Sequence, residues 1–528
     1  MFDLLIQNGQ VIDGAKNPGF EADVAIQRDV IASVGKLEGA EAARVIDAGG
    51  KVVAPGFIDI HSHGDFTLAA CPTADSLIHQ GVTTAVVGQC GLSLAPLLDA
   101  TRDEVTPSLD TRRMPIPWDK WSDFKSYLDF MKALGLSINI VPLVGQGTIR
   151  AGVMKFASGR ATPDQMAAMQ AEGVKALEAG AIGISTGLVY PPGSYASTEE
   201  LIELTRPVGQ RRGFYFSHIR GEGQFLTEAV AEAIRIGRET GAAVQISHLK
   251  AGWPNNWKKQ ARAVEMIEQA RLEGLDVSAD VYPYLAGSTS LKSGLPQWAQ
   301  EGGKGVMLRR LTEPGTRQKI VEGMKKEGLF QDGAWDKILI SHSTRRPDYA
   351  GRYVADMAAE AGKLPEEWVL DALVETELDP NMILFMISEA NLKTALQNPA
   401  VMIGSDSSTI PTHGPLAEGV PHPRTFGTFP RVLARYVREE GVLSLEEAVH
   451  KMTGLSANKL RLSDRGLIKA GLKADLVVFD PKTIRDRATY EDPFHYPEGI
   501  FQVICNGIPV IADGQPTGAR PGRVLAGG

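Results

Sequence analysis

Two histidines separated by one residue, His61 and His63, give the first chemical signal in the sequence. They follow a short apolar run at residues 57–60, which favours a β-strand. Residues i and i+2 of an extended chain point to the same side, so both imidazoles can bind one metal ion. Four more residues of metal-ligand type follow other short apolar runs: Cys90, His218, His248 and Asp406. Chance would not place so many ligand types at strand ends, so the sequence predicts a metal centre.

The other candidates have simpler interpretations. A lone histidine is more often a hydrogen-bonded structural residue, and four are interpreted in this way: His342, His79, His450 and His495. By itself, Cys90 would more often be a small buried apolar residue, and Asp406 could cap a helix. The metal interpretation therefore depends on the order of all six residues along the chain.

Short apolar runs alternate with helical patterns in the middle of the chain, which is typical of a parallel sheet covered by helices. Nine runs are strand candidates: residues 57–60, 83–88, 138–143, 181–185, 214–217, 244–247, 276–281, 338–341 and 401–405. A (β/α)8 TIM-like barrel needs eight strands, and its active site lies at their C-terminal ends. The stretch 285–346 is too long for a plain connection. We therefore expect an inserted cap at about 285–346, after strand seven, which contains the run 338–341.

Both ends of the chain consist of short strand patterns. Asn-Gly pairs at residues 8–9 and 506–507 favour hairpin turns, and a further hairpin is expected to turn near residues 28–29. The predicted fold is therefore α/β, with a small β-sandwich domain built from residues 1–55 and 465–528. The catalytic barrel is expected to span residues 56–464.

Composition excludes several classes of protein. The chain has 528 residues, a formal charge of −8 and only 3 Cys, so neither a nucleic-acid-binding surface nor a disulfide scaffold is expected. No apolar run reaches the ~18 residues of a membrane span, and no targeting segment is visible. We expect a cytoplasmic protein with a small-molecule substrate and without nucleic-acid or membrane partners, and homo-oligomerisation is left open.

Several motifs carry a resemblance to known enzymes. The segment PGFIDIHSH at 55–63 and the tail from Glu447 through DRG (464–466) to ADL (474–476) resemble the amidohydrolase superfamily. More narrowly, the chain resembles the D-aminoacylases, the N-acyl-D-amino-acid deacylases, over essentially its whole length. Four motifs carry this narrower likeness: GQCG (88–91), STGLVYPPG (185–193), SHLK (247–250) and HPR (422–424).

The resemblance implies which of these residues would hold each of two metal ions. Cys90, His218 and His248 would hold one tightly bound Zn²⁺, and a thiolate with two imidazoles suits that ion. A weaker or vacant second metal position would be surrounded by three other residues: His61, His63 and Asp406. Hydantoinases and dihydroorotases are expected to use a carbamylated Lys on strand four, but residues 185–187 read Ser-Thr-Gly here.

The implied reaction is hydrolysis of the amide bond of N-acyl-D-amino acids to a carboxylate and a free D-amino acid. Zinc lowers the pKa of its bound water towards ~7, and this water would be the nucleophile. Asp406 would act as general base and then protonate the departing amine. By resemblance, the α-carboxylate of the substrate would be bound by four residues: Lys250, Tyr190, Tyr282 and Arg424. Lys292 could add a preference for an acidic side chain, such as D-Glu or D-Asp, unless it is a solvated surface residue.

Two other functions are weighed against this one. A cyclic-amide hydrolase of the hydantoinase or dihydroorotase kind is disfavoured because strand four lacks a lysine. A non-catalytic protein on the same fold is disfavoured because all six ligand positions are present.

Overall fold

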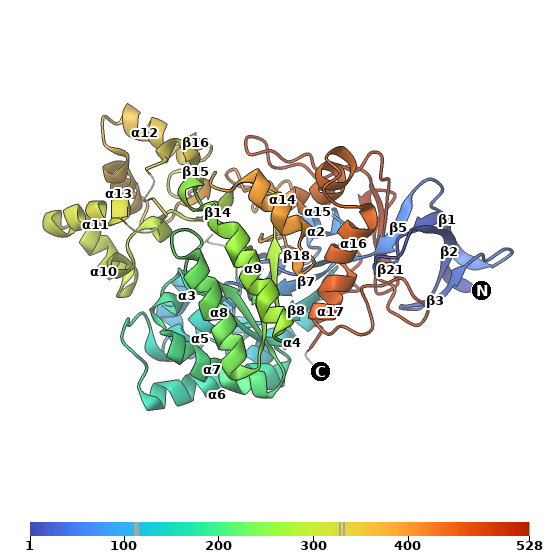
Figure 1. Ribbon diagram of the computed structural model, residues 1–528, viewed down its shortest axis with the longest axis horizontal. Coiled ribbons are helices and arrows are strands. Elements are labelled where there is room, and N and C mark those ends of the chain that lie inside the picture. Colours follow the sequence, from blue (N-terminus) through green and yellow to red (C-terminus); the bar gives the residue numbers. More distant parts are fainter. Residues whose placement is uncertain (110–115, 327–328, 331–332, 527–528) are drawn as a thin grey trace.

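A computed structural model describes residues 1–109, 116–326, 329–330 and 333–526. Figure 1 shows three parts along the long axis of the molecule. Strands from the two ends of the chain lie on the right, a helix-covered α/β part lies in the centre, and an inserted segment lies on the left.

The terminal strands form one nine-stranded sheet, in the order β22-β21-β20-β19-β5-β1-β2-β3, with β4 paired to β1. The strands are β1 (Phe2–Val11), β2 (Phe20–Gln27), β3 (Val30–Gly35), β4 (Ala42–Asp47), β5 (Val52–Pro55), β19 (Leu476–Phe479), β20 (Ile500–Cys505), β21 (Ile508–Ala512) and β22 (Gln515–Pro516). Both ends of the chain supply its apolar core, for example Ile6 and Val478. The hydrogen bonds make one continuous sheet, whereas a sandwich of two sheets was expected.

The turn expected at Asn8-Gly9 is wrong. Strand β1 continues through both residues, and its pairing with β2 shifts register between Ile6 and Gly9. Asn8 has a φ of 60°, so the left-handed conformation that favours a hairpin turn is used here in a β-bulge. The turns expected at residues 28–29 and 506–507 are confirmed, since β2 pairs with β3 and β20 with β21.

All eight strands expected for the central part are present and parallel, and a short ninth strand, β9, follows β8; together they lie in two sheets. The first has the order β6-β7-β8, and the second has the order β18-β13-β12-β11-β10-β9. The strands are β6 (Phe57–Asp59), β7 (Val82–Val87), β8 (Asn139–Pro142), β9 (Val144–Gly145), β10 (Gly183–Gly187), β11 (Phe214–His218), β12 (Ala243–Ile246), β13 (Val277–Val281) and β18 (Val401–Ile403). Within the described ranges, the ladders do not form one closed ring. A single bridge between Ser62 and Ser407 brings the end of β6 next to the end of β18.

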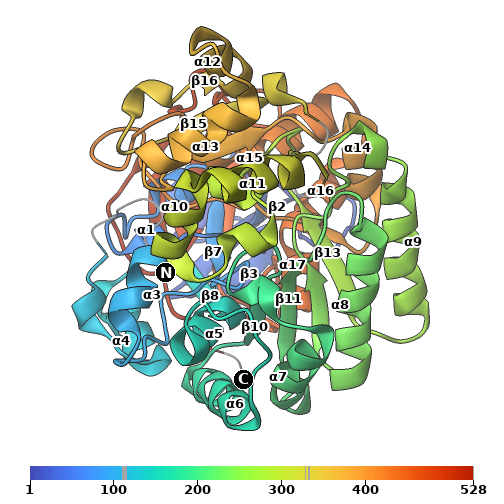
Figure 2. The same ribbon diagram turned by 90° about the vertical axis from the view of Figure 1, so that its left-hand side faces the viewer.

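Helices surround these strands, and Figure 2 shows α4 to α9 on their outer side. The helices of the central part are α1 (Asp65–Leu68), α2 (Asp75–Ile78), α3 (Arg102–Leu109), α4 (Phe124–Leu134), α5 (Gln146–Met154), α6 (Pro163–Ala179), α7 (Thr198–Gln210), α8 (Leu226–Thr240), α9 (Lys259–Leu272), α14 (Glu389–Gln397), α15 (Arg424–Arg431), α16 (Leu445–Met452) and α17 (Gly454–Lys459). A large apolar core fills the space between helices and strands, and this core fixes the strand ends on which the site is built.

The inserted segment leaves the central part after β13 and returns before β18. It contains an antiparallel sheet, β14-β17-β15-β16, and a separate apolar core. Its elements are β14 (Gly287–Ser290), α10 (Gly303–Thr312), α11 (Pro314–Lys326), β15 (Ile338–His342), β16 (Arg352–Tyr353), α12 (Val354–Glu360), α13 (Pro365–Glu375) and β17 (Asn381–Leu384). The run 338–341 lies inside it, as expected. The segment extends beyond the expected end at residue 346. Its first strand, β14, pairs with β17, so the segment is complete only after β17.

No helix among the residues that the structure describes is long and apolar enough to cross a membrane.

Candidate metal centre and active site

The six predicted ligand residues all lie at the C-terminal ends of parallel strands. His61 and His63 follow β6, Cys90 follows β7, and His218 is the last residue of β11. His248 and Asp406 lie beyond the ends of β12 and β18. The structure brings these side chains together in two groups that share Cys90, with ligand atoms within 4.8 Å of one another in each: His61, His63, Cys90 and Asp406; and Cys90, His218 and His248.

Three of these residues have an unusual backbone conformation. Cys90, His248 and Asp406 have φ values of 53°, 36° and 50°, although none is a glycine. Such conformations cost of order 1–3 kcal/mol each and persist only where the surroundings enforce them. Their presence at three strand ends of one site indicates that the fold holds these side chains in place against local preference.

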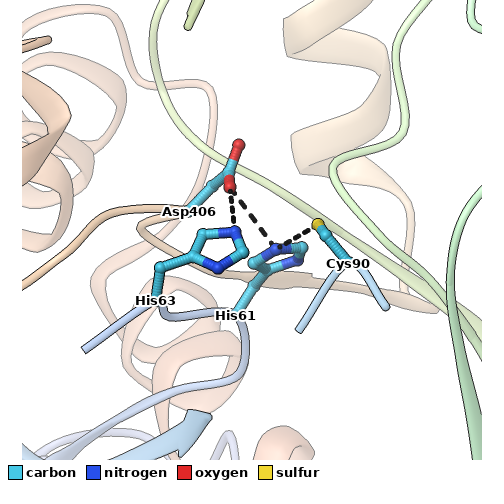
Figure 3. A group of neighbouring side chains, drawn as sticks. All are labelled: His61, His63, Cys90 and Asp406. Carbon is cyan, nitrogen blue, oxygen red and sulfur yellow. Dashed lines mark hydrogen bonds and ion pairs between the residues drawn. The ribbon is translucent and has the colours of Figure 1, made fainter. Parts of the chain in front are cut away.

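The first group is drawn in Figure 3, where His61 lies between the thiol and the carboxylate. His61 Nε2 is 3.4 Å from Cys90 Sγ and 3.4 Å from Asp406 Oδ1. His63 Nε2 is 3.2 Å from the same Asp406 oxygen. In the second group, Cys90 Sγ is 3.7 Å from His248 Nε2.

These donors fit a zinc ion. Zinc–ligand bonds of ~2.3 Å to sulfur and ~2.0–2.1 Å to nitrogen place the two ligand atoms roughly 3.5 Å apart in a tetrahedral site. The distance of 3.7 Å between Cys90 Sγ and His248 Nε2 is close to this value. His218 Nδ1 is buried and has no hydrogen-bond partner in the described part of the chain, so this nitrogen is not engaged by another protein group. Sulfur and imidazole nitrogen are also the donor types that zinc prefers.

The electrostatics of the site favour ionised ligands. Burial opposes ionisation of the Cys90 thiol, but the charge of His61 and the contacts of the sulfur with His218 and His248 lower the pKa of Cys90 well below its usual value. Burial likewise opposes the charge on Asp406, but Arg424 and the surrounding histidines lower the pKa of that carboxyl well below its usual value. A thiolate and a carboxylate are the forms that bind metals.

Two buried carboxylates behind the ligands were missed by the sequence prediction. Glu222 Oε1 is 2.8 Å from His248 Nδ1, and Asp280 Oδ1 is 3.3 Å from His61 Nδ1. Asp280 also accepts a hydrogen bond of 2.8 Å from the backbone N–H of His248. The available signal was position: Glu222 lies four residues after His218, and Asp280 is near the end of strand β13.

The four residues expected to bind a carboxylate lie around the same site. Lys250 Nζ is 2.5 Å from Glu222 Oε1, and Arg424 Nη1 is 2.8 Å from Asp406 Oδ2. Both cations face the ring of Tyr282, at 5.7 Å for Lys250 and 4.6 Å for Arg424. The Tyr282 hydroxyl is buried without a hydrogen-bond partner among the described residues.

The inserted segment reaches this site through its first strand. Tyr190, whose ring centre is 5.0 Å from that of His218, has its hydroxyl 3.0 Å from Thr289 Oγ1 of β14. Lys292 lies in the short helical turn directly after that strand and is half-buried. Burial and the nearby charge of Lys304 lower its pKa. An ion pair between Lys292 and an acidic residue is not found in the described ranges.

The four histidines interpreted as structural lie outside both ligand groups. His79 Nδ1 is 2.7 Å from Asp75 O, and His450 Nδ1 is 2.7 Å from Gly14 O. The remaining pair, His342 and His495, contact Thr344 and Asp492.

Strand β10 supplies no lysine to the site. It carries Ser185 and Thr186, and Lys175 lies on α6, where it pairs with Glu172 at 2.7 Å. This strand therefore has no lysine that could be carbamylated and bridge two metal ions.

Comparisons with known proteins agree with this geometry. A model of the amidohydrolase family matches residues 44–125 and 296–511. A D-aminoacylase of Alcaligenes xylosoxydans xylosoxydans is 40% identical over 526 residues, which cover 99% of this chain and 98% of that protein. A solved D-aminoacylase with a binuclear metal centre is 39% identical, with a TM-score of 0.82 and 100% of both chains covered. An N-acyl-D-glutamate deacylase of Bordetella bronchiseptica, solved with zinc and a phosphonate inhibitor, is 35% identical, with a TM-score of 0.84 and 99% of both chains covered.

The fold, the paired ligand groups and these matches define a metal-dependent amidohydrolase. Within that class, the chain belongs to the D-aminoacylase family of the amidohydrolase superfamily. The resemblance seen in the sequence motifs is thereby confirmed.

Proposed function

We propose that the protein hydrolyses the amide bond of N-acyl-D-amino acids, with zinc as its metal, and releases a carboxylate and a free D-amino acid. The observation that carries this proposal is the convergence of Cys90, His218 and His248 beside Asp406. The relatives described above are a D-aminoacylase and an N-acyl-D-glutamate deacylase. Their activities support cleavage of the N-acyl amide bond and a preference for D-amino acids in this protein.

The ligand groups support unequal occupancy of the two metal positions. We assign a tightly bound zinc to Cys90, His218 and His248, all nearly inaccessible to solvent. We assign a weaker position to His61, His63 and Asp406. Asp406 already pairs with Arg424, so a second metal would have to compete with that cation.

Asp406 is proposed to move the proton. When bound, zinc supplies Lewis-acid polarisation of the amide carbonyl and lowers the pKa of a water ligand. The Asp406 carboxylate would accept a proton from the attacking water and then donate it to the amine, which is a poor leaving group until protonated. Its position between the histidines and Arg424 places it at the centre of the site.

The substrate's α-carboxylate is proposed to bind on the side of the site that carries the two cations. Arg424 and Lys250 face the Tyr282 ring, whose free hydroxyl can donate a hydrogen bond, and Tyr190 lies beside His218. An arginine can donate two parallel hydrogen bonds to a carboxylate. Lys292, on the inserted segment near Thr289, is proposed to favour an acidic side chain.

The test is a screen of N-acetylated D- and L-amino acids, with zinc content measured on the same sample. We expect turnover of D substrates, little turnover of L substrates and zinc in the active protein. Opening of a hydantoin ring without deacylation would instead support a cyclic-amide hydrolase. Absence of both zinc and turnover would support a non-catalytic protein.

A further inference from the structure

Glu222 has no part in the chemistry proposed above, yet its carboxylate touches two groups of the site. It lies in the loop after β11, and its side chain is 11% exposed. Its Oε1 atom is 2.8 Å from His248 Nδ1 and 2.5 Å from Lys250 Nζ. One oxygen atom therefore faces both a proposed zinc ligand and a proposed substrate-binding cation.

We propose that Glu222 is a positioning residue that sets the tautomer of His248, so that the Nε2 lone pair of this ring stays available to the metal. The inference rests on the proposed metal centre but not on the identity of the substrate. It concerns where the single proton of a neutral imidazole is held.

His248 Nδ1 has two neighbours, and each favours a different protonation state of this nitrogen. The Glu222 carboxylate can only accept a hydrogen bond, so it requires a proton on Nδ1. The Lys250 ammonium, 2.9 Å from the same nitrogen, can only donate, so it requires a lone pair there. Because Nε2 faces Cys90 Sγ at 3.7 Å, only the tautomer with the proton on Nδ1 directs a lone pair towards the ligand group.

The backbone leaves His248 little freedom to adjust. Its φ of 36° is held by a 2.8 Å hydrogen bond from its N–H to Asp280 Oδ1. Its carbonyl oxygen accepts a 3.1 Å hydrogen bond from Lys250 Nζ. Since the backbone is held in this way, we expect loss of the carboxylate to change the position of the proton rather than the path of the chain. Lys250 would then donate to Nδ1, and the proton would move to Nε2, which faces the metal position.

Glu222→Leu removes the acceptor and is the central variant. Loss of a hydrogen-bond partner behind a metal-binding histidine typically costs 10–100-fold in metal affinity. We expect a loss in this range when zinc is titrated into the metal-free protein against a chromophoric chelator. Glu222→Gln should lose less, because the amide oxygen still accepts from Nδ1. Glu228→Leu, which changes an exposed glutamate of the following helix, is the matched control and should keep wild-type affinity.

The double variant Glu222→Leu/Lys250→Met tests the mechanism itself. With the competing donor removed, we expect zinc affinity to recover to within about threefold of the wild type, the range expected for Lys250→Met alone. If Glu222 acted only through packing, the losses of zinc affinity in the two single variants would instead add in the double variant. Proteins labelled with ¹⁵N at histidine give a second readout. The metal-free wild type should show His248 protonated at Nδ1, and Glu222→Leu should show it protonated at Nε2.

Unchanged zinc affinity and tautomer in Glu222→Leu would overturn the inference while leaving the proposed function intact. An affinity that falls in Glu222→Leu but does not recover in the double variant would also overturn it. A wild-type protein that binds no zinc would overturn the metal centre and the inference together. Circular dichroism of each metal-free variant identifies any that has not folded.

Discussion

Arg424 Nη1 lies 2.8 Å from Asp406 Oδ2, so the cation expected to bind the substrate is paired with the carboxylate expected to move the proton. Both side chains are nearly buried, and Asp406 also contacts His63 through its other oxygen. A substrate carboxylate that binds Arg424, as proposed, would therefore share this cation with Asp406. We therefore expect this ion pair to couple substrate binding to the environment of the proposed proton-transfer group.

Arg424→Gln is predicted to act mainly on KM. Hydrogen bonds to charged groups are worth about 1.5–3 kcal/mol, which corresponds to roughly 10–100-fold in affinity. We expect KM for an N-acetyl-D-amino acid to rise by about this factor, with a smaller effect on kcat. Steady-state kinetics measure both constants, and Arg485→Gln, at an exposed arginine, is the control. A kcat that falls with KM unchanged would contradict the binding role.

Asp406→Asn is predicted to keep the tightly bound zinc and to lose most activity. General acid–base catalysis typically contributes ~10²–10⁴ in rate, and an amide side chain cannot accept the proton. Metal analysis should find zinc near the wild-type level, because the tight site is proposed to use Cys90, His218 and His248. Full turnover in this variant would refute the assigned role.

Lys292→Met is predicted to change substrate preference rather than general activity. If Lys292 binds an acidic side chain, the ratio of kcat/KM for N-acetyl-D-Glu over N-acetyl-D-Leu should fall about 10- to 100-fold, in line with the loss of a charged hydrogen bond. Lys363→Met, on the same inserted segment and exposed, is the matched control. An unchanged ratio would identify Lys292 as a residue without a role in specificity.

Asp29→Asn is predicted to lower stability at neutral pH but not in strong acid. The Asp29 carboxylate contacts Lys473 at 2.9 Å and Arg523 at 2.8 Å, and these contacts lower its pKa from 3.8 to about 2. Because the pKa is lower in the folded protein, the stabilisation is present above pH 3.8 and is lost as the pH falls towards 2.

We expect a destabilisation of about 1 kcal/mol at pH 7, since the pair is partly exposed and solvent screens it. Thermal unfolding of the variant and the wild type at pH 7, 5 and 3 measures the difference. Asp99→Asn, at an exposed position, should show none. A difference that is equally large at pH 3 and pH 7 would contradict the ion-pair explanation.

The sequence predicted the strands better than their pairing. Apolar runs report burial, and each of the eight parallel strands is buried, so their positions could be found. Register and closure depend on partners far along the chain, and sequence patterns do not encode them locally. For this reason the bulge at Asn8 was mistaken for a turn, and the partner of β14 at residues 381–384 was missed.

The convergence of the candidate ligand residues could also be predicted, because cysteine and histidine at strand ends are uncommon and chemically specific. Glu222 and Asp280 could not, because most acidic residues in loops or at strand ends are solvated or capping. Only the fold shows that these two carboxylates lie against His248 and His61. The supporting groups of a metal centre are therefore harder to predict than the ligands themselves.

The most direct test of the account is the zinc content and affinity of Cys90→Ser. The wild type should retain about one zinc per chain after dialysis, and the variant should lose it together with deacylase activity, because a serine hydroxyl is a much poorer zinc ligand than a thiolate. Cys71→Ser, at another buried cysteine, should behave as the wild type. A Cys90→Ser protein that binds zinc as tightly as the wild type and deacylates at the full rate would contradict the account.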